Sequence, residues 1–167
     1  MITAATRSVD QTRELAAAIA ELARPGDLIL LVGDLGAGKT AFAQGFGAAL
    51  GVTEPITSPT FTLARQYEGG RLELNHLDVY RLEQIEESFD LGLAELLDGP
   101  AVMLIEWGDT IVPALPADYL EVRLTYGDED DDRTVQFRSV GPRWASRSRA
   151  LSDALRPWIV DDVEVNS

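Results

Sequence analysis

A glycine-rich segment in the first quarter of the chain has residue types and spacing suited to holding phosphate groups. Residues 33–40 match the pattern Gly-x-x-x-x-Gly-Lys-Thr, preceded by an apolar run and followed by a helical pattern. Glycines let the main chain curl with its N–H groups inward, and a helix N-terminus favours anions. The loop residues expected to bind nucleotide are Gly33, Asp34, Leu35, Gly36, Ala37, Gly38, Lys39 and Thr40. The alternative is a glycine-rich turn without a ligand.

The basic residue of this loop is unusual for the chain. Lys39 is the sole lysine among the 14 lysine and arginine residues. It stands where the pattern needs a slim ammonium that reaches the β and γ phosphates, while the hydroxyl of Thr40 serves as a ligand of Mg²⁺. The Asn-Lys-x-Asp motif that specifies guanine needs a second lysine, so the sequence favours ATP over GTP.

Two carboxylates at strand ends are candidates to complete the site. Glu106 follows the apolar run 102–105, which resembles a Walker B strand, and Asp78 lies in His-Leu-Asp-Val-Tyr-Arg at 76–81. Ligands of α/β sheets bind beyond the carboxyl ends of the strands, so both are predicted as catalytic residues and Mg²⁺ ligands. Alternatively, Glu106 caps a nearby amide.

Other polar residues near these motifs have two readings each. His76 shares a strand face with Asp78 and either positions water or is a hydrogen-bonded structural histidine. Thr60, in Thr57-Ser58-Pro59-Thr60, either senses the γ-phosphate from a switch segment or bonds its own backbone in a proline turn. Tyr80 is expected to pack, and Arg81 is left undecided.

Sequence periodicity predicts the elements that carry these residues. A Ser-x-x-Gln capping box opens the first helix, and Gly69-Gly70 is expected as a tight turn between two strands. Helices are predicted at 8–24, 39–50, 91–97 and 142–155, and strands at 28–32, 60–68, 71–80, 101–107, 119–126 and 133–139. This mixture predicts a three-layer α/β fold of the P-loop NTPase type, with a mostly parallel sheet and antiparallel edge strands. Residues 1–158 are expected to form one domain, followed by a flexible acidic tail at 159–167.

Composition limits the classes of function. The 167 residues carry a net charge of −14 and no cysteine, which disfavours direct binding of nucleic acid and excludes a disulfide scaffold. A local basic patch of Arg143, Arg147, Arg149 and Arg156 stays possible. No apolar run is long enough to span a bilayer and no signal peptide is recognisable, so no membrane association and a cytoplasmic location are expected.

Four motifs in order resemble the bacterial TsaE (YjeE) family: Gly-Asp-Leu-Gly-Ala-Gly-Lys-Thr at 33–40, Ser-Pro-Thr-Phe-Thr-Leu at 58–63, His-Leu-Asp-Val-Tyr-Arg at 76–81 and Ile-Glu-Trp-Gly at 105–108. The resemblance implies an ATPase that supports TsaB and TsaD in threonylcarbamoyladenosine modification of tRNA, with the tRNA held by those partners. It implies phosphate and Mg²⁺ binding by Lys39 and Thr40, Mg²⁺ and hydrolysis roles for Asp78, and a Walker B role for Glu106.

The same resemblance assigns Thr60 to the switch segment and brings Trp107 close to the nucleotide, although Trp107 would otherwise be read as core packing. Many relatives have a second threonine after the P-loop where this chain has Ala41. Two other classes of function stay open. One is a small-molecule kinase using Arg65, Arg71 and Arg81, and the other is a nucleotide-gated binding module without turnover.

Overall fold

The computed structural model describes residues 1–34, 36–57, 64–78, 93–106 and 116–160. Seven described strands form one sheet in the order β1-β7-β6-β2-β5-β4-β3. The strands are β1 (Ile2–Thr6), β2 (Leu28–Gly33), β3 (Ala64–Tyr67), β4 (Leu74–Asp78), β5 (Val102–Glu106), β6 (Tyr119–Tyr126) and β7 (Arg133–Val140). The helices are α1 (Val9–Ala20), α2 (Lys39–Ala49), α4 (Leu93–Asp98), α5 (Pro142–Ala145) and α6 (Ser148–Leu155), followed by the 3₁₀ turn η2 (Arg156–Trp158).

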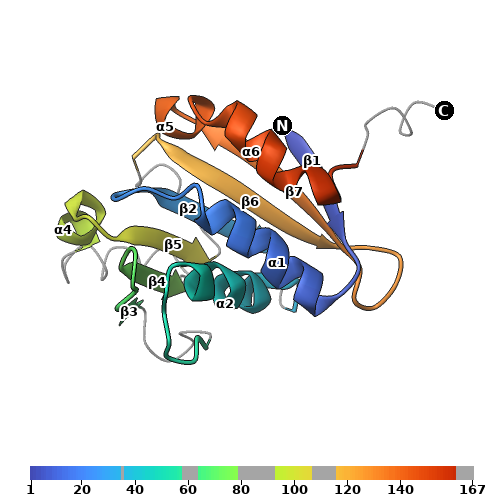
Figure 1. The fold of residues 1–167 in the computed structure, drawn as a ribbon, viewed down its shortest axis with the longest axis horizontal. Coiled ribbons are helices and arrows are strands. Elements are labelled where there is room, and N and C mark those ends of the chain that lie inside the picture. The colour runs from blue at the N-terminus through green and yellow to red at the C-terminus, as the bar shows by residue number, and fades with distance from the viewer. Residues whose placement is uncertain (35, 58–63, 79–92, 107–115, 161–167) are drawn as a thin grey trace.

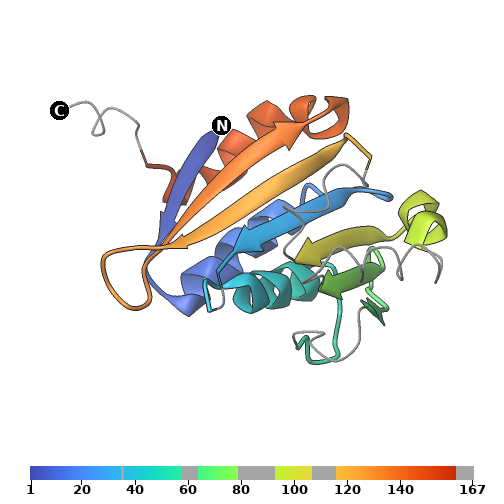
Figure 2. The same cartoon turned by 180° about the vertical axis from the view of Figure 1, so that it is seen from behind.

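The middle of the sheet is parallel and its edges are antiparallel. Strands β6, β2, β5 and β4 run in the same direction, whereas β3 pairs antiparallel with β4, and β7 pairs antiparallel with both β6 and β1. Figure 1 shows α1, α2 and α6 in front of the strands, and Figure 2 shows the sheet from behind. The predicted α/β class with a parallel centre and antiparallel edges is confirmed.

Apolar side chains pack on both faces of the sheet. The larger cluster joins α1, α2 and α6 to the alternate strand residues Ile29, Leu31 and Leu104. The smaller cluster holds the intervening residues, including Leu30 and Ile105, with Leu97 of α4 packed against it. Because successive residues of a strand point to opposite faces, the continuous apolar runs of β2 and β5 follow from burial on both sides.

Helix α1 starts as predicted but ends early. The Ser8 side chain accepts a hydrogen bond from the Gln11 N–H, while Gln11 Oε1 accepts from the Arg7 N–H, one residue earlier than in a standard capping box. The helix ends at Ala20 and not at Arg24.

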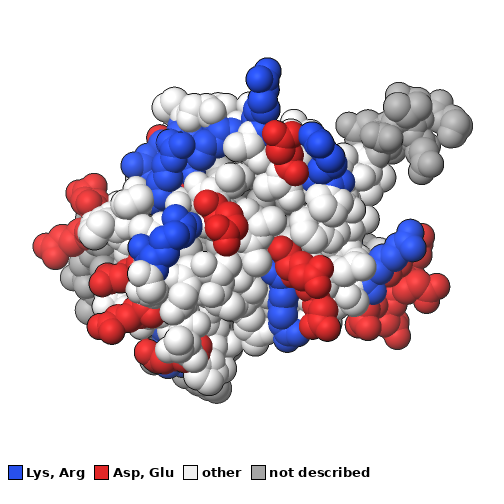
Figure 3. Space-filling model, viewed as in Figure 1, with Lys and Arg blue, Asp and Glu red and all other residues white. Residues whose placement is uncertain are grey.

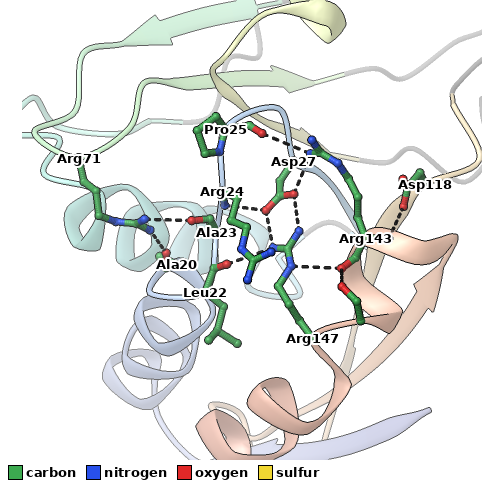
Figure 4. A network of polar contacts seen from close by, with 11 residues as sticks. Ala20, Leu22, Ala23, Arg24, Pro25, Asp27, Arg71, Asp118, Arg143 and Arg147 are labelled. Carbon is green, nitrogen blue, oxygen red and sulfur yellow. Dashed lines mark hydrogen bonds and ion pairs between the residues drawn. The ribbon is translucent and has the colours of Figure 1, made fainter.

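Distant arginine donors bind the carbonyl oxygens at the end of α1 and in the turns that follow it. After Ala20 the chain tightens into turns in which the N–H of Leu22 bonds to Ile19 and that of Ala23 bonds to Ala20. Arg71 donates to the Ala20 and Ala23 carbonyl oxygens, and a second arginine, Arg147, donates to Leu22 O (Figure 4). Side-chain donors thus satisfy carbonyl oxygens near the end of the helix that have no partner within it.

The predicted helix over residues 142–155 is wrong as a single element. It is broken between α5 and α6, where Arg147 turns its guanidinium into the core. Arg147 Nη1 and Nη2 lie 2.6 and 2.7 Å from the two carboxylate oxygens of Asp27, which is fully buried, and Arg143 Nη1 lies 3.0 Å from the same carboxylate (Figure 4). The guanidinium of Arg147 also stacks on the Trp144 ring at 4.2 Å.

This network also corrects the suggested basic patch. Arg147 is buried and, like Arg143, is paired with Asp27, while Arg156 is paired with Asp153. Of the four arginines, Arg149 alone is exposed without such a pair in the described residues. Arg143 and Arg147 therefore fasten the junction of α5 and α6 to the residue before β2.

The tight turn predicted at Gly69-Gly70 is wrong as well. Tyr67 pairs with Leu74, so the connection between β3 and β4 spans residues 68–73. The Arg71 N–H donates to Leu50 O at the end of α2, and a Cβ on Gly51 would lie 2.5 Å from Gly70 N. The connection at residues 68–73 therefore packs closely against the C-terminal end of α2.

The last described residues return to the edge of the sheet. The Val160 N–H donates to Thr3 O, and Ile159 forms a bridge with Ala4 of β1. The rest of the predicted tail, residues 161–167, lies outside the described residues. In the part of the chain that the structure describes, no helix combines the length and apolarity needed to cross a bilayer.

Candidate nucleotide-binding site

The glycine-rich loop leaves the carboxyl end of β2 in a conformation that depends on its glycines. Gly36 and Gly38 have φ angles of 81° and 107°, in the left-handed region that residues with a Cβ rarely adopt. Gly33 lies so close to β6 that a Cβ on it would stand 2.7 Å from Leu124 O. Larger residues at these positions would strain the loop or push it away from the sheet.

The loop turns back on itself and opens directly into α2. The Ala37 N–H donates to Asp34 O at 3.0 Å, and α2 begins at Lys39 with Gly38 as its N-cap, where no side chain makes a capping bond. The first N–H groups of α2 are therefore available to an anion, in line with the partial positive charge of a helix N-terminus. Lys39 and Thr40 are half-buried in this first turn. Leu35 lies outside the described residues.

Helix α1 fixes the position of α2, and hence of Lys39 and Thr40. At their crossing, a Cβ on Gly45 would lie 2.2 Å from Arg13 O. Arg13 Nε and Nη2 both donate to Gln44 Oε1, and Gln44 Nε2 donates to Ile56 O. This chain of contacts also holds the main chain just before the Thr57-Ser58-Pro59-Thr60 segment.

Asp78 and Glu106, the two predicted carboxylates, lie side by side. They are partners in the parallel ladder between β4 and β5, at the carboxyl end of each strand, and Glu106 is in turn paired with Leu31 of β2. Residues in register on neighbouring strands point to the same face, and Leu31 and Leu104 belong to the cluster covered by α1 and α2. Asp78 and Glu106 therefore point to the sheet face that α2 covers, near the edge where the loop leaves β2. Each is only 2% exposed.

His76 is placed beside the same acidic residue. Its Nε2 atom lies 3.2 Å from Glu106 Oε1, and the imidazole is fully enclosed. Within the described residues, neither atom completes a well-oriented hydrogen bond. His76, two residues before Asp78 on β4, therefore contacts Glu106 from within the core.

Several sequence candidates cannot be placed. Thr60, Trp107, Tyr80 and Arg81 lie outside the described residues, so their predicted roles stay predictions. Immediately before the undescribed segment 58–63, which contains Thr60, the Thr57 hydroxyl accepts a hydrogen bond from Arg65. Arg71, suggested for a kinase-type cluster, instead binds the carbonyl oxygens of Ala20 and Ala23 at the end of α1. These carbonyls lie close to Asp27 (Figure 4), and therefore at the end of β2 opposite the glycine-rich loop.

One contact to the loop was missed by sequence reasoning. Arg133, the first residue of β7, donates to the carbonyl oxygens of Gly36 and Ala37. It is 97 and 96 residues away from them in sequence, and it follows an acidic run that reads as a solvated turn. No local pattern marks it, because the contact depends on how the β6–β7 hairpin sits beside the loop.

The donor chemistry at this edge suits Mg²⁺. The candidate ligands are the Thr40 hydroxyl and the carboxylates of Asp78 and Glu106, all of them hard oxygen donors. Mg²⁺ is commonly held by one or two carboxylates together with phosphate oxygens and water. The described residues contain no group of three or more acidic, histidine or cysteine side chains close enough to hold a metal by themselves. A divalent ion bound jointly with a phosphate ligand fits this arrangement.

Comparison with known proteins identifies a family whose matched region contains this site. The family model described as threonylcarbamoyl adenosine biosynthesis protein TsaE matches residues 6–135. The chain belongs to the TsaE family. The match includes the glycine-rich loop, both carboxylates and Arg133, and the family is one of tRNA threonylcarbamoyladenosine biosynthesis.

Individual TsaE relatives cover most of the chain. The tRNA threonylcarbamoyladenosine biosynthesis protein TsaE of Bacillus subtilis is 43% identical over 147 residues, covering 88% of this chain and 91% of the relative. That of Nostoc sp. is 47% identical, covering 72% and 75%. Among solved structures, Bacillus subtilis YdiB superposes with a TM-score of 0.78 at 36% identity, covering 92% of this chain and 97% of YdiB.

Proposed function

We propose that this TsaE-family chain binds Mg-ATP on the loop at 33–40 and hydrolyses it in support of TsaB and TsaD during threonylcarbamoyladenosine modification of tRNA. The observation that carries the proposal is the loop itself, with left-handed Gly36 and Gly38 leading into an uncapped helix N-terminus at Lys39. Main-chain N–H groups arranged in this way favour phosphate oxygens.

The side chains around the loop have distinct roles in this proposal. The ammonium of Lys39 neutralises the β and γ phosphates, and Trp107 and Thr60 contribute contacts to the nucleotide. Mg²⁺, held by Thr40, Asp78 and Glu106, supplies charge neutralisation of the phosphates. One of the two carboxylates, Glu106 or Asp78, orients the attacking water and accepts its proton. Their pairing on adjacent strands supports a shared site.

The charge of the chain supports an indirect relation to tRNA. A net charge of −14 disfavours direct contact with a phosphate backbone, so the tRNA is bound by the partners. The pathway acts on tRNA inside the cell, and a cytoplasmic location belongs to the same proposal.

Calorimetry and phosphate release test the proposal. Titration of the full chain with Mg-ATP should give saturable binding, and phosphate release should rise when TsaB and TsaD are added. Absence of binding in every mixture, partners included, would falsify the proposal. Transfer of the γ-phosphate to a metabolite would instead identify a kinase, and nucleotide-dependent partner binding without turnover would identify a gated binding module.

A further inference from the structure

The guanidinium of Arg133 connects the β6–β7 hairpin to the glycine-rich loop. On the loop side, Nε donates to Ala37 O at 3.1 Å and Nη2 donates to Gly36 O at 3.2 Å. On the hairpin side, Nη1 donates to Asp130 O at 2.6 Å and to Asp132 O at 2.8 Å. One side chain therefore binds four main-chain carbonyl oxygens, two on each segment.

Tyr126 supports this arginine from the neighbouring strand. It is the ladder partner of Arg133, and the guanidinium carbon lies 4.6 Å from the centre of its ring. The same tyrosine approaches the loop closely, because a Cβ on Gly36 would stand 2.8 Å from its hydroxyl. The ring is half exposed. Stacking limits the orientations of the guanidinium and so keeps its fork aimed at the loop.

The bonds to Arg133 fix the direction of two peptide groups. In a planar trans peptide the C=O and the N–H point in opposite directions, so holding the Ala37 carbonyl toward Arg133 turns the Gly38 N–H away from it. The peptide between Gly36 and Ala37 is held at both ends, since the Ala37 N–H donates to Asp34 O. The part of the loop with left-handed glycines is thus fixed from outside the loop.

Arg133 binds main-chain carbonyl oxygens although many carboxylates lie near it in sequence. The hairpin carries Asp128, Glu129, Asp130, Asp131 and Asp132. Figure 3 shows acidic side chains gathered at the right edge of the molecule, where Figure 1 places this hairpin. Even so, Arg133 makes no ion pair with a carboxylate among the described residues, and all its hydrogen bonds go to main-chain carbonyls. The side chain of Arg133 therefore holds main-chain segments together.

We propose that Arg133, stacked on Tyr126, is a positioning residue that holds the segment Gly36 to Gly38 in its phosphate-binding shape before nucleotide arrives. The inference rests on the proposed function of the loop. An ordered loop binds phosphate more tightly, because the entropy of ordering is not lost on binding. Lysine cannot replace arginine here, since a single ammonium cannot reach carbonyls of both segments with a planar fork.

Two measurements on the full chain test this role. The first is the dissociation constant for Mg-ATP of the wild type, Arg133→Met and Arg133→Lys. The second is amide hydrogen exchange of peptides covering residues 36–40 in nucleotide-free protein, which does not depend on ATP binding. A matched control is Arg138→Met on the same strand, whose exposed guanidinium pairs with Glu121 and does not contact the loop.

We expect both Arg133 variants to raise the dissociation constant about tenfold or more, as for loss of charge-assisted hydrogen bonds. Exchange at residues 36–40 should become faster, while Arg138→Met behaves like the wild type. Tyr126→Leu should change both readouts in the same direction by a smaller factor.

The outcomes separate this inference from the function of the loop. Wild-type affinity and exchange in Arg133→Met would overturn the positioning role, as would full recovery of both by Arg133→Lys, since charge alone would then suffice. If the wild type binds no Mg-ATP, the proposed function fails, and exchange at the loop still decides whether Arg133 orders it. If Arg133→Met does not fold, the exchange of Arg133→Lys gives the decision.

Discussion

The Nε2 atom of His76 lies 3.2 Å from Oε1 of Glu106, and both side chains are closed off from solvent. The contact ties the end of β5 to β4, the strand that also carries Asp78. The enclosed imidazole restricts the position of the buried carboxylate, although neither atom completes a well-oriented hydrogen bond among the described residues. Such a fixed acid is suited to orienting water.

Glu106→Gln should therefore separate hydrolysis from binding. The substitution keeps the shape of the side chain but removes its charge and its capacity to accept a proton. We expect phosphate release in the presence of TsaB and TsaD to fall by about 10²-fold or more. The dissociation constant for Mg-ATP should change far less, because the amide keeps one oxygen ligand for Mg²⁺ and Lys39 still binds the phosphates. An unaltered rate would reject Glu106 as a catalytic residue.

Asp78→Asn should change the response to magnesium. Loss of a carboxylate oxygen weakens a hard-cation site, so the Mg²⁺ concentration for half-maximal phosphate release should rise about tenfold. Glu73→Gln is a matched control, since Glu73 is an exposed carboxylate directly before the other end of β4. The same magnesium response in both variants and the wild type would leave Asp78 without a metal role.

Lys39→Ala should weaken Mg-ATP binding about 10- to 100-fold, because the main counter-charge of the phosphates is removed. Lys39→Arg restores the charge with a broad guanidinium and should recover only part of the affinity. Calorimetry measures both, and unfolding in urea checks that the variants remain folded. Near-normal affinity in Lys39→Ala would contradict the assignment of the loop.

The buried network around Asp27 should affect stability and leave nucleotide binding alone. Arg147→Met leaves the carboxylate of Asp27 without its two shortest ion-pair contacts, and it should lower the free energy of unfolding by about 3–5 kcal/mol. Arg156→Met removes an exposed pair with Asp153 and should cost less than about 1 kcal/mol. If urea unfolding gave the same loss of unfolding free energy for Arg147→Met and Arg156→Met, burial of the Asp27 pair would not contribute to stability.

Gly45→Ala tests the crossing of α1 and α2. The new Cβ would meet Arg13 O at 2.2 Å, so the helices must separate, at a cost of about 1–3 kcal/mol despite the better helix propensity of alanine. Because α2 carries Lys39 and Thr40, the affinity for Mg-ATP should fall too. Gly70→Ala has its nearest neighbour at 3.8 Å and should be nearly neutral. Stability above the wild type in Gly45→Ala would refute the close-contact argument.

The sequence predicts what local pattern determines. The strand at residues 119–126 matches β6 at both ends, and the loop at 33–40 stands between its predicted strand and helix. Asp78 and Glu106 were both predicted as strand-end carboxylates of one site, and the ladder pairs them directly.

Errors occur where distant residues decide the local structure. Where α1 ends early, Arg71 and Arg147 bind carbonyls of the turns that follow it, and where the C-terminal helix is broken, Arg147 pairs with Asp27. The role of Arg133 depends on a contact across 96 residues of sequence. Periodicity contains none of this information, because these contacts exist only in the folded chain.

The hydrogen bond from Val160 to Thr3 O brings the two ends of the described chain together at β1. In the strand order, β1 is separated from β5 and β4 by β7, β6 and β2. Labels attached at the first or the last described residues would thus lie at the same border of the sheet, away from Asp78 and Glu106. These residues are suitable attachment points for immobilising the protein while Asp78 and Glu106 stay away from the support.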